Sequence, residues 1–139
     1  MEYPLLDTSV FSTYKKQIDE NFDAFYFSIV VFYELMASMI DKSTLQKYEH
    51  WLGILDKGGR LLMLAKADWI ICAKAVRRLR HQKLIDKNLS STALQNDALI
   101  ARSSLTHKCF VVTDNIRDYA LLQKVMPKLE VIPAAEFFK

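Results

Sequence analysis

Four acidic residues lie next to or within apolar segments of this 139-residue chain. Folding buries such segments and therefore draws these acids towards the interior. Asp and Glu are rarely fully buried unless they are paired or bound to a metal, and carboxylates that converge repel one another. The chain is therefore restricted to folds that can gather negative charge and compensate it. The four residues are Asp7 after the run 3–6, Glu34 within 28–36, Asp97 at the start of 97–101, and Asp114 after 110–113.

Short apolar runs alternate with amphipathic segments, and only three Gly and three Pro interrupt them. This alternation predicts an α/β fold with a mainly parallel central sheet and helices on both faces. The length suits a single domain over 1–139, and Ser43 or Thr44 is expected to cap the second helix. We expect strands at 3–7, 25–28, 60–64, 109–113 and 130–132, and helices at 29–39, 43–57, 66–84, 92–107 and 116–125.

The ends of the predicted strands point to a binding site. Ligands of parallel sheets bind at the carboxyl ends of the strands, and Asp7 and Asp114 each follow a predicted strand. Hard cations such as Mg²⁺ commonly neutralise converging carboxylates. The pattern predicts a carboxylate pocket for a divalent metal, with Asp7 and Asp97 as ligands and metal-assisted phosphodiester hydrolysis as its chemistry.

Three of these acids also have a purely structural explanation. Asp7 suits the cap of a helix starting at 8 or 9, and Asp97 is favoured by the dipole of its own helix. Asp114 suits the start of an Asx-turn with Asn115. Glu34 is different, because its neighbours at helical spacing are apolar or small. An unpaired charge there costs several kcal/mol, so another group has to compensate it.

Basic residues are concentrated in the predicted helix 66–84, although the formal net charge is only +3. Clustered Lys and Arg indicate a surface for the phosphate backbone of a nucleic acid, and the alternative is an ordinary solvated helix face. The residues assigned to nucleic-acid binding are Lys74, Arg77, Arg78, Arg80 and Arg117, the last beside the pocket.

The cysteines and the start of the chain bear on its compartment. Cys72 and Cys109 have apolar flanks and form no CxxC or Cys/His cluster, so neither a zinc site nor a disulfide is expected. The start shows no basic region followed by an apolar stretch, and no apolar run approaches the ~20 residues that cross a membrane. We expect a soluble, cytoplasmic protein without membrane association.

Four motifs resemble, in the same order, those of PIN-domain ribonucleases. They are similar to the family's opening strand ending in Asp-Thr-Asn/Ser, its Glu-bearing helix, its Asp-x-x-Ile-Ala helix start and its closing Thr-x-Asn/Asp-x-x-Asp-Phe motif. The resemblance covers nearly the whole chain, and the length matches the VapC-type toxins of toxin–antitoxin pairs. The motifs are Leu5-Leu6-Asp7-Thr8-Ser9-Val10, Ser28-Ile29-Val30-Val31-Phe32-Tyr33-Glu34-Leu35, Asn96-Asp97-Ala98-Leu99-Ile100-Ala101 and Val111-Val112-Thr113-Asp114-Asn115-Ile116-Arg117-Asp118-Tyr119.

The resemblance implies a PIN-domain-like three-layer α/β/α fold and an endoribonuclease that uses Mg²⁺ or Mn²⁺. Many relatives place the fourth acid where this chain has Asn115, so Asp114 or Asp118 has to supply that carboxylate. Hydroxyl groups nearby are expected to orient water or a phosphate oxygen. The expected catalytic residues are Asp7, Glu34, Asp97 and Asp114, the metal ligands are these four and Asp118, and the substrate-orienting residues are Thr8, Ser9, Thr113 and Asn115.

The aromatic residues of the first half exceed what one small core needs, which predicts exposed apolar surface and a protein partner. The VapC resemblance implies RNA as substrate, a homodimer, and an antitoxin bound at the hairpin 29–55, with an antitoxin Arg against the acidic pocket. The alternative is a catalytically degenerate PIN module that binds RNA or a protein partner without cleavage. The aromatic residues are Phe11, Tyr14, Phe22, Phe25, Tyr33, Tyr48, Trp51 and Trp69.

Overall fold

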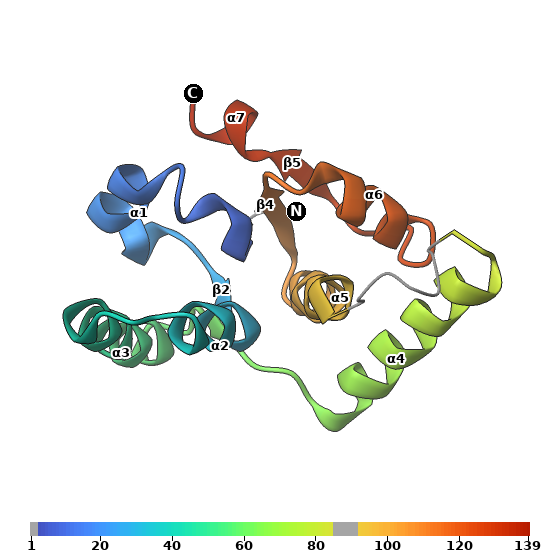
Figure 1. The fold of residues 1–139 in the computed structure, drawn as a ribbon, viewed down its shortest axis with the longest axis horizontal. Helices are drawn as coiled ribbons and strands as arrows, with labels where there is room; N and C mark the ends of the chain where they lie inside the picture. Colours follow the sequence, from blue (N-terminus) through green and yellow to red (C-terminus); the bar gives the residue numbers. More distant parts are fainter. Residues whose placement is uncertain (1–2, 85–91) are drawn as a thin grey trace.

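The computed structural model describes residues 3–84 and 92–139, in which short strands alternate with helices (Figure 1). The strands are β1 (Tyr3–Leu6), β2 (Phe27–Ser28), β3 (Leu61–Leu62), β4 (Cys109–Thr113) and β5 (Val131–Pro133). The α-helices are α1 (Lys15–Asn21), α2 (Ile29–Ala37), α3 (Lys42–Lys57), α4 (Lys66–His81), α5 (Thr92–Thr106), α6 (Ile116–Gln123) and α7 (Ala134–Phe137). Two short 3-10 turns are η1 (Thr8–Val10) and η2 (Phe22–Ala24).

Every strand in the described part of the chain runs parallel to its neighbours. β1 pairs with β4 and β4 with β5, so that Leu5 lies opposite Val111 and Val111 opposite Val131. β2 pairs with β3, and a parallel bridge between Leu5 and Tyr26 joins this pair to β1. The order β3-β2-β1-β4-β5 confirms the expected parallel sheet. It also brings the residues that follow β1 and β4 to the same edge.

Helices flank this sheet and share one hydrophobic cluster with it. In Figure 1, α5 lies next to β4 and is seen end-on, α4 crosses and contacts α5, and α1 lies across the molecule from α4. Leu5 and Val111 of the sheet and Ile100 of α5 are completely buried in the cluster. The expected α/β class with helices around a parallel sheet is therefore confirmed.

Most of the aromatic residues expected at the surface lie in or against the core, so that expectation is wrong for them. Phe22 stacks on Trp51 with ring centroids 4.5 Å apart, and Tyr48 packs edge-on against Trp51. These rings pack between α3 and η2. Of the eight, two are largely exposed, Tyr33 at 70% and Trp69 at 52%.

Four helices in particular differ from what the sequence pattern predicts. α1 is not predicted because its sequence is polar and buries only Ile18, and α7 is a single short turn. α3 begins at Lys42, one residue early, because the Asp41 carboxylate accepts hydrogen bonds from the backbone N–H groups of Ser43 and Thr44, both at 3.2 Å. The expected cap at Ser43 or Thr44 is therefore wrong. α4 ends at His81 rather than at 84.

Both cysteines behave as small core residues. Cys72 and Cys109 are buried and free, and burial raises the pKa of each thiol to about 11. Each thiol is therefore protonated and inert near neutral pH.

No helix within residues 3–84 and 92–139 is both long enough and apolar enough to cross a membrane.

The N-terminal end of α4 is fixed by Asp68. One carboxylate oxygen accepts the backbone N–H of Ala65 at 2.8 Å, and the other accepts Nε–H of Arg102 on α5, also at 2.8 Å. The hydrogen bond from Arg102 is the main reason that the pKa of Asp68 lies below its usual value. A single carboxylate therefore caps α4 and attaches it to α5.

Replacing Asp68 with Asn should lower the free energy of unfolding by about 1–3 kcal/mol, because the Arg102 guanidinium loses its anionic partner. Urea unfolding measures this loss. The control is Asp56→Asn, which removes an exposed carboxylate from α3 and should change stability by less than about 0.5 kcal/mol. Equal stability of Asp68→Asn and the wild type would show that this carboxylate does not hold α4.

Candidate active site

Asp7 lies directly after β1 and is only 2% exposed. Its backbone N–H donates to the Val112 carbonyl, which continues the β1–β4 ladder by one residue. Ser9 and Thr113 each donate a hydroxyl to Oδ2 at 2.8 Å, and the Tyr119 hydroxyl donates to Oδ1 at 3.1 Å. The carboxylate makes no capping hydrogen bond to η1. Asp7 is therefore a buried acceptor held by three hydroxyls, and the structural explanation as a helix cap does not apply.

Glu34 lies in α2 with its side chain half-buried. Thr8 donates its hydroxyl to Oε1 at 2.7 Å, and Asn96 of α5 donates its amide N–H to Oε2 at 3.2 Å. These two donors supply the compensation that an acid among apolar neighbours requires. They also fix the carboxylate between the loop after β1 and helix α5.

Asp97 and Asp118 are joined by one amide group. Nδ2 of Asn115 donates to Oδ2 of Asp97 and to Oδ2 of Asp118, both at 3.0 Å. Asp97 is 6% exposed in α5, and Asp118 is half-buried in the first turn of α6. The two carboxylates therefore lie close together, with Asn115 between them.

Burial first, and then the negative charges of Asp7, Asp118 and Glu34, together raise the pKa of Asp97 to about 8. All three charges act on Asp97, so four acids from four segments form one electrostatic cluster. Such a shift is typical of functional sites, where charge is gathered for binding or chemistry.

Asp114 is placed differently from the other predicted acids. Its side chain is exposed at the end of β4, and the acids whose charge acts on Asp97 are Asp7, Glu34 and Asp118. Of the two candidates for the fourth acid, Asp118 is therefore the one inside the cluster. A catalytic role of Asp114 stays a prediction.

The hydroxyl residues that were expected to orient substrate hold carboxylates in this structure. Thr8 donates to Glu34, while Ser9 and Thr113 donate to Asp7. Tyr119 and Asn96 belong to the site although their roles were not predicted. Both were detectable, since Tyr119 follows Asp118 in the closing motif and Asn96 precedes Asp97, but only the fold shows that they donate to Asp7 and Glu34.

The carboxylates of the cluster are potential ligands for a divalent metal. Within the described ranges, no three Asp, Glu, His or Cys side chains form a ready-made metal cage. A Mg²⁺ site needs only one or two protein carboxylates, because the ion keeps several of its waters. Asp7 and Asp97 meet this need, since both are buried carboxylates and the charge of Asp7 disfavours ionisation of Asp97. The oxygen-rich set therefore fits a hard cation.

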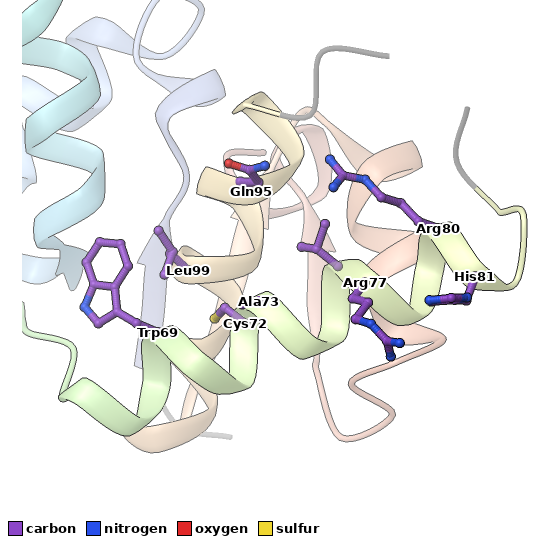
Figure 2. Close-up of a pocket in the computed structure, with 9 residues that line it drawn as sticks. Trp69, Cys72, Ala73, Arg77, Arg80, His81, Gln95 and Leu99 are labelled. Atoms are coloured by element: carbon purple, nitrogen blue, oxygen red, sulfur yellow. The ribbon is translucent and has the colours of Figure 1, made fainter. Parts of the chain in front are cut away.

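Two apolar hollows adjoin the acidic cluster. One, of about 380 Å³, lies between α2, α4 and α5, and is lined by Tyr33 and by Asn96, the residue that donates to Glu34. The other, of about 430 Å³, lies between α4 and α5 (Figure 2). Trp69 and Leu99 line both, so the two hollows are neighbours along α4, and we call them together the groove. Asn96 is the lining residue that contacts Glu34.

The basic residues of α4 are divided between two surfaces. Arg77, Arg80 and His81 line the second hollow towards the C-terminal end of α4, away from Trp69 (Figure 2). Lys74 and Arg78 are exposed and do not line it. Arg117, also predicted to contact RNA, is exposed on α6 next to Asp118.

Comparison with solved structures identifies the architecture. A chain of VapBC-1 from nontypeable Haemophilus influenzae matches with a TM-score of 0.60 at 17% identity, over 95% of this chain and 98% of that one. The protein therefore shares the fold of one chain of that complex. DNA-bound VapBC from Salmonella typhimurium gives a TM-score of 0.59 at 16% identity over 96% and 99% of the two chains, and FitAB bound to the IR36 DNA fragment gives 0.62 at 18% over 94% of each.

The sequence comparisons gave no match. No protein-family model fits the chain, and no curated protein matches it. The predicted PIN-like fold is therefore confirmed by structure, whereas the activity and partners have to be argued from the site.

Replacing Asp97 with Asn should make the metal-free protein more stable at pH 8 by roughly 1–3 kcal/mol. The pKa of Asp97 rises from 3.8 to about 8 on folding, so the wild type loses stability as the pH increases between these values. Asn cannot ionise, which removes that loss. Urea unfolding in a chelator should show curves that diverge towards pH 8 and converge at pH 4. A constant difference across this range would contradict the cluster's electrostatics.

Proposed function

We propose that the chain is a cytoplasmic, metal-dependent endoribonuclease of the VapC type, the toxin of a toxin–antitoxin pair. The observation that supports it best is the convergence of Asp7, Glu34, Asp97 and Asp118 at the carboxyl edge of a parallel sheet. Gathering four acids is costly for stability, so a function that uses the charge is required. Metal-assisted phosphodiester hydrolysis is such a function.

Asp7 and Asp97 would hold Mg²⁺ or Mn²⁺, with Asp118 beside them. When bound, the ion supplies Lewis-acid polarisation of the phosphodiester and a lowered pKa for coordinated water. The residues around it keep the ligands in place. The hydroxyls of Ser9, Thr113 and Tyr119 hold the Asp7 carboxylate in one orientation.

Glu34 is suited to accept a proton during cleavage. Its carboxylate is half-buried and is fixed by Thr8 and Asn96, which leaves further lone pairs of its oxygens for a nearby water. General-base catalysis by a positioned carboxylate contributes about 10²–10⁴-fold. Thr8 and Asn96 act on the reaction through Glu34.

The RNA backbone would contact basic residues that flank the cluster. Arg117 on α6 lies within the closing motif, next to Asp118, and Arg77 and Arg80 line the groove. Lys74 and Arg78 extend the positive charge over the outer surface of α4. Contacts of this kind give affinity for phosphate without sequence preference.

The apolar groove along α2, α4 and α5 would receive the antitoxin of a homodimeric toxin. Tyr33 and Trp69 line it and are exposed in the free chain, which is typical of a surface that a protein partner covers. The groove's lining residue Asn96 contacts Glu34, so a basic antitoxin residue would find a carboxylate close to the groove. The groove includes Tyr33 of the hairpin 29–55, and we extend the predicted docking site from this hairpin to α4 and α5. The similar structures are themselves VapBC and FitAB complexes.

Replacing Asp7 with Asn should reduce RNA cleavage in Mg²⁺ or Mn²⁺ by at least about 10³-fold, because the ion loses a buried charged ligand. Cleavage of a single-stranded RNA pool measures the effect, and Asp56→Asn serves as the control with an unaltered site. Metal should also raise the melting temperature of the wild type and of Asp56→Asn, but not of Asp7→Asn.

The same assay separates the alternative function. A wild type that binds RNA but neither cleaves it nor responds to metal would be a degenerate binding module.

Replacing Trp69 with Ala should weaken binding of the antitoxin by about 10- to 100-fold, since buried aromatic side chains dominate such interfaces. The binding partner is the short protein encoded next to this gene. Its affinity is measured by calorimetry, with each substitution made in the Asp7→Asn variant so that the toxin is inactive. Ile71→Ala is a matched control, because Ile71 is exposed on α4 and lines neither hollow. Equal losses for both variants would contradict docking in the groove.

A further inference from the structure

Asn115 occupies the centre of the acidic cluster and is fixed on its backbone side. Its N–H donates to the Thr113 hydroxyl oxygen at 2.9 Å, and that hydroxyl in turn donates to Asp7. The side-chain amide then reaches Asp97 and Asp118 at 3.0 Å each. One residue thus connects three of the acids.

The chemistry of the neighbours determines which way the amide points. Both atoms that it meets are carboxylate oxygens, which accept hydrogen bonds. The NH₂ group therefore faces them, because the amide oxygen in that position would place a third acceptor, with its partial negative charge, against two carboxylate oxygens. An NH₂ group has two hydrogens, and the structure gives one to each carboxylate.

The same geometry limits how far the two acids can separate. Both oxygens lie 3.0 Å from one nitrogen, so the distance between them cannot exceed twice that value. Two carboxylates at this spacing repel each other. In the absence of an ion, the partial positive charge of the amide hydrogens offsets this repulsion.

The geometry assigns to Asn115 the role of a positioning residue that takes the place of a cation between Asp97 and Asp118. This inference rests on the proposed metal-dependent function, because it concerns how the site is held before the ion arrives. With Asn at this position, the carboxylates are kept together without metal. With Asp, the cluster gains a fifth carboxyl group, loses both donors, and depends on cations to stay folded.

The test is Asn115→Asp, compared with the wild type and with Asn21→Asp. The control adds the same charge on α1, where the Asn21 amide donates only to the exposed Gln17 carbonyl. In a chelator, Asn115→Asp should melt about 5 °C or more below the wild type, and Asn21→Asp much nearer to it. Millimolar Mn²⁺ should recover this loss, so that its stabilising shift is larger in Asn115→Asp than in the wild type.

The outcomes separate this inference from the proposed function. A wild type without any Mn²⁺ shift contradicts the metal-dependent function. Equal melting of Asn115→Asp and the wild type in chelator overturns the role of Asn115, whatever the wild type does with metal. A second measurement uses Asn115→Ala, Asp118→Ala and the double variant in chelator. The melting losses should be non-additive if the amide acts on Asp118, and additive losses overturn the inference.

Discussion

Repulsion among four buried or half-buried carboxylates is the constraint on which this structure depends. Asp7, Glu34, Asp97 and Asp118 come from distant parts of the chain, and the strand order brings them to one edge. Side-chain donors hold the acids there in the absence of any cation, three of them on Asp7 alone. The folded protein therefore stores an electrostatic cost that a divalent ion is able to relieve.

The elements around the cluster connect it to the surface. α5 carries Asn96 and Asp97, and α4 is attached to α5 by the Asp68–Arg102 ion pair. Because Leu99 of α5 and Trp69 of α4 line both hollows, the placement of α4 also shapes the groove beside Asn96. Charge and apolar surface are thus adjacent, as the proposed function of cutting RNA and being blocked by a protein would require.

Much of this arrangement follows from the sequence. Alternating apolar runs predict the parallel sheet, and acids at the ends of such runs predict the cluster, because both depend on local order along the chain. Partners distant in sequence are not predictable in this way. Asn115 looks like a missing acid until the fold places its amide between Asp97 and Asp118. The aromatic residues were predicted to be exposed for the same reason. Trp51 is covered by Phe22, a residue far from it in the sequence, and this contact exists only in the folded structure.

The central claim is that these carboxylates form a divalent metal site. Anomalous scattering from crystals soaked in millimolar Mn²⁺ tests it most directly, because manganese is located without any assumption about activity. The account predicts a peak in contact with the carboxylates of Asp7 and Asp97, and no such peak in crystals of Asp7→Asn. Crystals of the wild type with Mn²⁺ at other acids of the surface and none at Asp7 and Asp97 would contradict it.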